Sequence, residues 1–139
     1  MCGIAGVWGS SDTKAVNRMM GRLVHRGPDA RGQHRDRFGV LGHQRLSIMD
    51  PQGGDQPIYS AGRDRVIVAN GEIYNFPQLR EQLGEGTAFT TSSDSESALH
   101  LYSRERQQTA ERLDGMFAFA LADGPDLYVA RDPLGIKPL

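Results

Sequence analysis

Met1-Cys2-Gly3-Ile4-Ala5-Gly6-Val7-Trp8 opens the chain, and the rest of the sequence is best interpreted outward from it. The segment 3–8 is a short apolar run with two glycines, which is typical of a buried strand. The only cysteine of the chain stands immediately before that run. The stretch therefore predicts a core strand that begins at a thiol.

Cys2 has two interpretations. Removal of Met1 would place its thiol beside its own α-amine, and in model peptides a thiol has a pKa of about 8.5 and an α-amine one of about 7.7–8.0. The amine can then take the thiol proton, directly or through water, so no catalytic histidine is required. The alternative is a buried strand cysteine that acts only as a small hydrophobe. The cysteine by itself leaves both open.

Composition narrows the class of protein. The chain has 139 residues, enough for one domain with a real core. A net charge of -1 gives no support for a nucleic-acid or membrane-surface partner. The lone cysteine rules out an internal disulfide and suits a reducing compartment. No signal peptide and no apolar run of ~18 residues is visible. These features predict a cytoplasmic globular domain.

Periodicity predicts strands and helices in alternation. Strands are expected at 38–46, 66–69, 116–121 and 127–130, the last two as a hairpin. Apolar spacing at 16, 19, 20 and 23 predicts a first helix with both methionines in the core. Asn75 can cap a second helix that Gly84 closes. Ser93 and Glu96 form a capping box before a third. The pattern indicates a mixed, layered domain.

Asn70-Gly71 follows the strand at 66–69 and is a strong turn signal. The Asn70 side-chain amide and the Gly71 N–H could both point at one developing negative oxygen. Losing one such donor typically costs ~10²–10³ in rate. An ordinary turn is the alternative interpretation.

Charged residues suggest recognition of an amino acid. Arg45 could hold a carboxylate with two parallel hydrogen bonds, or it could be a solvated surface arginine. Glu72 and Asp94 could hold an ammonium group, although Asp94 also suits the first turn of a helix for structural reasons. One cation and two carboxylates match an α-amino acid zwitterion. The histidines have no metal-ligand spacing and the glycines no nucleotide motif, so no metal or cofactor is expected.

Seven segments together resemble a known family. They are MCGIAG, HRGPD (25–29), HQRLSIMD (43–50), NGEIYNF (70–76), SDSE (93–96), GMFAFA (115–120) and ARDPLGIKPL (130–139). Their order is similar to that in the class II, N-terminal nucleophile glutamine amidotransferases, and most closely to the glutaminase domain of asparagine synthetase. The resemblance covers essentially the whole chain.

The resemblance implies an α+β fold, a four-layer αββα sandwich with the nucleophile at the end of a central strand. It implies that Cys2 attacks the L-glutamine side-chain amide, with Asn70 and Gly71 as the oxyanion hole. It also implies a set of glutamine-binding residues: Arg45 for the α-carboxylate, Glu72 and Asp94 for the α-ammonium, and the backbone of Leu46, Ser47, Ile48 and Met49. The 25–29 segment would form a loop that orders on glutamine binding, with Arg26 contributing charge.

The family domain continues past GIKPL with further strands, and an ATP-dependent synthetase domain normally follows. We therefore expect residues 1–139 to be a C-terminally incomplete amidotransferase domain whose unpaired sheet edge permits self-association. The glutaminase step would need no cofactor, and ATP and Mg would belong to the absent synthetase domain. The alternatives are a glutaminase domain with another ammonia acceptor, a silent glutamine- or partner-binding remnant, and a redox-sensing thiol protein.

Overall fold

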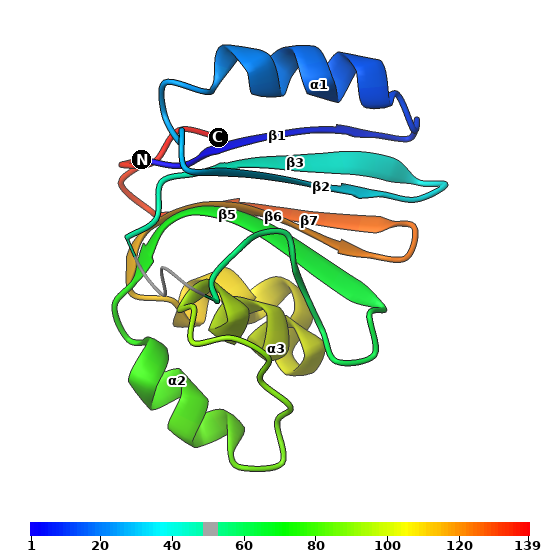
Figure 1. The fold of residues 1–139 in the computed structure, drawn as a ribbon. Coiled ribbons are helices and arrows are strands. Elements are labelled where there is room, and N and C mark those ends of the chain that lie inside the picture. The colour runs from blue at the N-terminus through cyan, green and yellow to red at the C-terminus, as the bar shows by residue number, and fades with distance from the viewer. Residues whose placement is uncertain (49–52) are drawn as a thin grey trace.

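The computed structural model describes residues 1–48 and 53–139. Two antiparallel sheets lie face to face in it, and helices cover both outer faces (Figure 1). One outer face is covered by α1 (Thr13–Arg22). The other carries α2 (Phe76–Leu83), α3 (Ser95–Glu105) and the 3-10 helix η1 (Arg106–Arg112). The four layers confirm the expected α+β sandwich.

The first sheet has the strand order β1-β3-β2. Its strands are β1 (Gly3–Trp8), β3 (Gly39–Arg45) and β2 (Ala30–Arg35). β3 is the central strand and pairs antiparallel with both neighbours, with Gly3 opposite Gln44 at the end nearest the N-terminus. The strand predicted at the start of the chain is confirmed at its exact bounds of 3–8.

The helix α1 packs on this sheet through Val16 and Met20, which are both fully buried. Gly42 of β3 permits the close approach, because a Cβ there would lie 2.7 Å from the Met20 sulfur. The other methionine, Met19, is 41% exposed, so its predicted place in the core is wrong. Consecutive residues of a helix project about 100° apart, so when Met20 faces the sheet the adjacent Met19 points away from it.

The second sheet has the order β4-β5-β6-β7. Its strands are β4 (Ile58–Tyr59), β5 (Arg65–Ile73), β6 (Gly115–Asp123) and β7 (Asp126–Arg131). Alternate side chains of β5 and β6 enter two different cores. Between the sheets lie Leu41, Val66, Val68 and Ala122, whereas the helix side is filled by Ile67, Leu99, Phe117, Phe119 and Leu121. The predicted hairpin at 116–130 is confirmed as β6–β7.

Asn70-Gly71 does not form the predicted turn. β5 continues through both residues to Ile73, with Asn70 opposite Ala118 and Gly71 opposite Phe117. Gly71 has φ +139°, and a Cβ there would lie 1.9 Å from the Met116 carbonyl oxygen. Glycine is required at this position by close backbone approach within the sheet.

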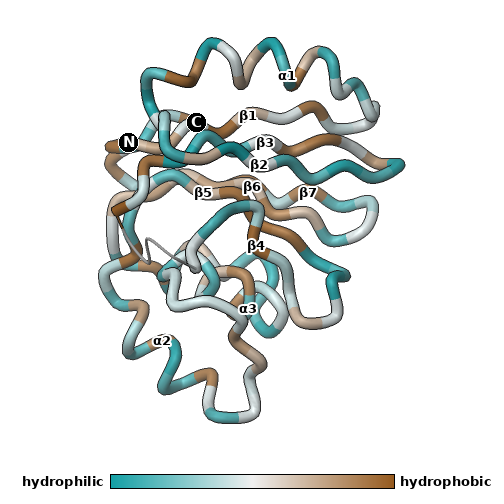
Figure 2. Tube along the Cα trace, in the orientation of Figure 1, coloured by the Kyte–Doolittle hydropathy of each residue, from teal (hydrophilic) through white to brown (hydrophobic). Residues whose placement is uncertain are grey.

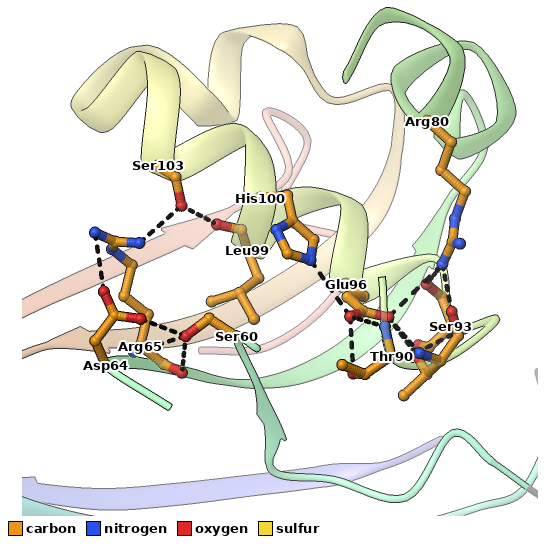
Figure 3. A network of polar contacts seen from close by, with 11 residues as sticks. Ser60, Asp64, Arg65, Arg80, Thr90, Ser93, Glu96, Leu99, His100 and Ser103 are labelled. Carbon is orange, nitrogen blue, oxygen red and sulfur yellow. Dashed lines mark hydrogen bonds and ion pairs between the residues drawn. The ribbon is translucent and has the colours of Figure 1, made fainter. Parts of the chain in front are cut away.

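The capping box predicted before α3 is also wrong. Asp94 is the residue that precedes the helix, and the Glu96 carboxylate turns away from Ser93 N–H. It accepts instead from the backbone N–H of Thr90 at 2.6 Å and of Thr91 at 2.7 Å, and from both hydroxyls (Figure 3). His100 lies 3.4 Å from it, one turn along α3. Glu96 therefore fixes the 90–91 segment to the start of α3.

The second helix is confirmed as α2, with Asn75 before it and Gly84, at φ +80°, after it. Asn75 does not cap it with its side chain. Its amide instead donates to Arg112 O at 2.9 Å and accepts from Asp114 N–H at 3.0 Å. Asn75 therefore ties α2 to the segment that enters β6.

Two strands were not predicted from the sequence. β2 has the residues ARGQHR and is one of the most hydrophilic stretches of the sheets in Figure 2. It has no apolar alternation because it is a sheet-edge strand. β4 has only two residues and offers no period to detect. Among the described residues, no helix has both the length and the apolar character needed to cross a bilayer.

Candidate active site

Cys2 lies immediately before β1, and its thiol is held against the residue that follows β3. Leu46 N–H donates to Cys2 Sγ at 3.4 Å, and Sγ lies 3.6 Å from Leu46 O, to which the thiol can donate. Arg26 Nε donates to Cys2 O at 3.1 Å. The thiol is partly buried, so it is neither a core hydrophobe nor freely solvated.

A cavity of about 70 Å³ opens beside this thiol. It is lined by eight of the ten residues predicted to form a site, namely Cys2, Arg45, Leu46, Ile48, Asn70, Gly71, Glu72 and Asp94. They come from the residue before β1, the end of β3 and the segment that follows it, the end of β5 and the residue before α3. Segments far apart in the sequence therefore converge on one cavity, which we call the thiol pocket.

The remaining two predicted residues differ from these eight. Ser47 does not line the thiol pocket, and its N–H donates to Asp29 Oδ2 at 2.7 Å. Met49 lies outside the described residues. The Asp29 N–H in turn donates to Arg45 O at 2.9 Å. The 25–29 loop is thus tied to the chain that leaves β3, beside the pocket.

The end of β5 presents Asn70 and Gly71 to the thiol pocket. Antiparallel pairing alternates, so the N–H and C=O of Gly71 point away from β6 and toward the β4 side. Tyr74 N–H donates to Asp114 O, which fixes even-numbered residues of β5 as those facing β6. β4 extends only to Ile58, opposite Ile67, and does not reach Gly71. The Gly71 N–H is therefore directed at the pocket.

Asp94 is a buried carboxylate that also lines the thiol pocket. Its side chain accepts a hydrogen bond from Ile73 N–H at 2.6 Å, and the residue is 3% exposed. Burial raises the pKa of the Asp94 carboxyl, the hydrogen bond from Ile73 opposes that rise, and the nearby Glu72 charge adds to it. A cation placed between the two carboxylates would stabilise their ionised forms.

Arg45 supplies positive charge to the same pocket. It is 5% exposed, so the alternative of a solvated surface arginine is wrong. Its Nη1 contacts Asp55 Oδ1 at 2.7 Å, and the Asp55 side chain is 72% exposed. Because its partner is exposed to solvent, the guanidinium can exchange Asp55 for an incoming carboxylate or bind both carboxylates together.

Sequence reasoning missed other residues of the site. Lys137 and Gln56 line the thiol pocket, and Lys137 is 7% exposed. Lys137 lies in the ARDPLGIKPL segment, which contributed to the resemblance but suggested no individual role. Gln56 lies in the irregular segment that leads into β4, where no periodicity marks it.

His43 is fully buried between the sheets, with Nε2 2.9 Å from Ala69 O. Burial lowers the pKa of the His43 imidazole to about 4, so the ring is neutral near pH 7. Among the described residues, no group of three or more His, Cys, Asp or Glu side chains is arranged to hold a metal ion.

A second cavity, of about 500 Å³, lies between β1 and β7 and also reaches Cys2 and Asn70. Its other walls are mainly apolar, with Ile4, Leu41 and Val68 among them, and Arg26 is the one charged side chain among the described residues that line it. The smaller thiol pocket is the better site for a zwitterion, because it alone combines the thiol with charges of both signs.

The chain is similar to proteins of a known family. Residues 1–139 match the family model described as a glutamine amidotransferase domain. Asparagine synthetase (glutamine-hydrolyzing) 2 of Oryza sativa subsp. japonica is 44% identical over 146 residues, covering 100% of this chain and 24% of the rice protein. The Asparagus officinalis asparagine synthetase (glutamine-hydrolyzing) is 45% identical over 148 residues, covering 100% of this chain and 25% of that protein. The chain thus spans about a quarter of the length of the curated relatives it matches.

Among solved structures, the glutamine phosphoribosylpyrophosphate amidotransferase from B. subtilis, complexed with ADP and GMP, superposes with a TM-score of 0.81. The match covers 99% of this chain and 38% of that one, at 24% sequence identity. At this identity the likeness concerns the fold, and it agrees with the helix–sheet–sheet–helix layers described above.

Proposed function

Because the chain belongs to the glutamine amidotransferase domain family, we propose that it hydrolyses L-glutamine to L-glutamate and ammonia at the thiol pocket. The observation that carries the proposal is the convergence of Cys2, Asn70, Gly71, Arg45 and Asp94 on that single cavity. These residues supply a nucleophile, two oxyanion donors and charges of both signs.

In this proposal, Cys2 becomes the N-terminal residue and its α-amine takes the thiol proton. The thiolate attacks the side-chain amide carbon of glutamine, and the amide oxygen becomes an oxyanion. Collapse of the tetrahedral intermediate, with proton transfer from the ammonium to the leaving nitrogen, releases ammonia and leaves a thioester. Water then attacks the thioester and gives glutamate and the free thiol.

Asn70 and Gly71 would stabilise the oxyanion in both tetrahedral intermediates. Asn70 is 3% exposed, and the side chain lies in the wall shared by both cavities at Cys2. The Gly71 N–H is directed away from β6, and β4 does not cover it. Donors fixed before the reaction cost no reorganisation when the charge develops, which is why such pairs have large effects.

Arg45, Glu72 and Asp94 would select the α-amino acid group of the substrate. The guanidinium would bind the α-carboxylate, and the two carboxylates would bind the α-ammonium. Leu46 and Ile48 line the pocket between these charges and are proposed to contact the substrate. We extend the same proposal to Ser47 and Met49, the first through its backbone at the pocket's margin.

We further propose that the ammonia serves an ATP-dependent synthetase domain that amidates aspartate, as the names of the relatives suggest. ATP and Mg would act in that domain and not in the thiol pocket. Residues 1–139 would then be the glutaminase part of a larger assembly.

The test is a glutaminase assay on purified protein, in which glutamate and ammonia are both quantified. Equal yields of both from L-glutamine, absent with the Cys2→Ala variant, are expected. The intact mass of the same sample establishes whether Cys2 is N-terminal. If protein with an N-terminal Cys2 binds glutamine but forms no glutamate, the silent binding remnant is the correct interpretation.

A further inference from the structure

The edge of β5 that faces β4 is completed by a side chain where a strand would be expected. β4 pairs with β5 at Ile58 and Tyr59, in a register that places position 56 opposite Ala69. At that position the Gln56 side-chain amide takes the place of a strand backbone. Ala69 N–H donates to Gln56 Oε1 at 2.6 Å, and Gln56 Nε2 donates to Ala69 O at 3.3 Å. Together they satisfy both backbone groups of Ala69.

The rest of this edge explains why a side chain is useful there. In the same register a longer β4 would place position 54 opposite Gly71 and cover its N–H. The Gln56 side chain makes its two hydrogen bonds to Ala69 and does not extend to the next pair. The Gly71 N–H therefore remains open to the thiol pocket. The next residue of the row, Ile73, donates its N–H to Asp94 Oδ2 at 2.6 Å. Gly71 is thus held between two side-chain contacts.

Gln56 is itself held in place. Gly32 of β2 packs against it so closely that a Cβ at Gly32 would lie 1.9 Å from Gln56 O. His43 Nε2 lies 2.9 Å from Ala69 O, and because a carbonyl only accepts, this nitrogen carries the proton. The Ala69 carbonyl therefore has two donors, which come from β3 and from the segment before β4.

We infer that Gln56 is a positioning residue of the proposed glutaminase reaction. By holding both backbone groups of Ala69 it fixes the peptide unit before Asn70, and so it aims the Asn70 amide and the Gly71 N–H at the oxyanion. This inference rests on the proposed function. Donors must be held within about 0.5 Å of their productive place, and a displacement of about 1 Å can cost ~10² in rate.

The experiment compares Gln56→Met, which keeps the length but loses both hydrogen bonds, with the parent chain. We expect kcat to fall roughly 10–100-fold while KM stays within about twofold, since donors to the oxyanion act mainly in the transition state. Gln56→Glu keeps the acceptor for Ala69 N–H, so its kcat should lie between those of the parent and Gln56→Met. In the Asn70→Ala background, Gln56→Met should lower kcat by a smaller factor than it does in the parent.

Two controls separate positioning from general destabilisation. Gln33→Met makes the same chemical change on β2, where Gln33 Nε2 donates to Asn17 Oδ1 at 3.4 Å and Gln33 is not among the residues that line the thiol pocket. Leu79→Ala destabilises the helix layer, where Leu79 is 2% exposed, without touching the thiol pocket. Both should keep the parent kcat when assayed well below their melting temperatures.

A readout independent of activity is hydrogen exchange at the Ala69 amide, followed residue by residue by NMR. Protection should fall in Gln56→Met and persist in Gln56→Glu. Unchanged protection in Gln56→Met would overturn the inference, as would a kcat no lower than that of Leu79→Ala. Both of these outcomes leave an active parent and the proposed function intact. A parent that hydrolyses no glutamine would instead remove the proposed function, and the inference with it.

Discussion

The Cys2 thiol and the Leu46 backbone form a reciprocal contact: Leu46 N–H donates to Sγ at 3.4 Å, and Leu46 O lies 3.6 Å from the same sulfur. The contact joins the residue before β1 to the residue after β3. It places the thiol in the lining of the thiol pocket. The pairing of β1 with β3 begins at the next residue, Gly3. A thiol held by the backbone does not depend on a flexible loop for its position.

Cys2→Ala should abolish glutamine hydrolysis, lowering kcat at least ~10³-fold, because the proposed thioester cannot form without the thiol. The fold should persist, since the thiol makes only two weak contacts to Leu46. Glutamate release measured over hours, together with circular dichroism, tests this. Ammonia release above a small fraction of the parent rate would show that Cys2 is not the nucleophile.

Met1 should be absent from active protein. Met1 lines the thiol pocket beside Cys2 and is 53% exposed, so a processing enzyme can reach it. Only after its removal does the Cys2 α-amine become available as the base. Intact-mass analysis of active and inactive fractions measures this directly. An active fraction that fully retains Met1 would contradict the one-residue nucleophile and base.

Much of the fold could be predicted because its core elements have simple periods. The run at 3–8 became β1, and the β6–β7 hairpin lies where two apolar runs separated by a turn predicted it. β2 was missed because an edge strand needs no apolar face, and β4 because two residues carry no pattern. Local patterns also misassigned Asn70-Gly71, where pairing with β6 outweighs the turn preference of the dipeptide.

Many of the residues that line the thiol pocket could be predicted by residue type, but the geometry of the pocket could not. Chemistry-bearing residues such as Arg45 and Asp94 could be chosen by type, and the structure places both at the thiol pocket. Gln56 could not be found, because its importance comes from the strand register that sets it opposite Ala69. Register is a property of paired strands, and a single sequence shows each strand separately.

Arg45→Ala and Asn70→Ala should affect different kinetic constants, the first mainly KM and the second mainly kcat. Arg45→Ala should raise KM by roughly 10–100-fold with less change in kcat, because a charged substrate group loses its partner in the ground state. Asn70→Ala should lower kcat ~10²–10³-fold with little change in KM, since its donor acts when the oxyanion forms. Steady-state kinetics on both variants measures the two constants and tests the two roles. The reverse pattern would exchange or remove the two assigned roles.

Glutamine binding should weaken as pH falls because Asp94 gains a proton. Burial raises the pKa of this carboxyl above its usual value, so it gains a proton at a higher pH than an ordinary aspartate. The protonated form cannot pair with the substrate ammonium. KM should therefore rise as pH falls through the raised pKa. In Asp94→Asn, KM should be high at every pH and this dependence should vanish. A pH profile of KM for both proteins tests the role, and identical profiles would refute it.

Glu96 should contribute acid-sensitive stability. Burial opposes its ionisation, but hydrogen bonds from His100, Thr90 and Thr91 outweigh that effect and lower the pKa of Glu96 from 4.5 to about 2 (Figure 3). A depressed folded-state pKa stabilises the protein above the unfolded value, and this stability is lost as pH falls from 4.5 toward 2.

Glu96→Gln should therefore lower the free energy of unfolding near pH 7 by up to about 3 kcal/mol. The glutamine NH₂ would face donors on Thr90 or Thr91 where the carboxylate now accepts from all of them. Glu111→Gln, an exposed change on η1, is the control and should have little effect. Urea unfolding at about pH 7 and about pH 2.5 measures the difference between each variant and the parent. The Glu96→Gln deficit should shrink at the lower pH, because acid removes the same stabilisation from the parent. A deficit of equal size at both values would mean that packing around Glu96, and not its charge, sustains the start of α3.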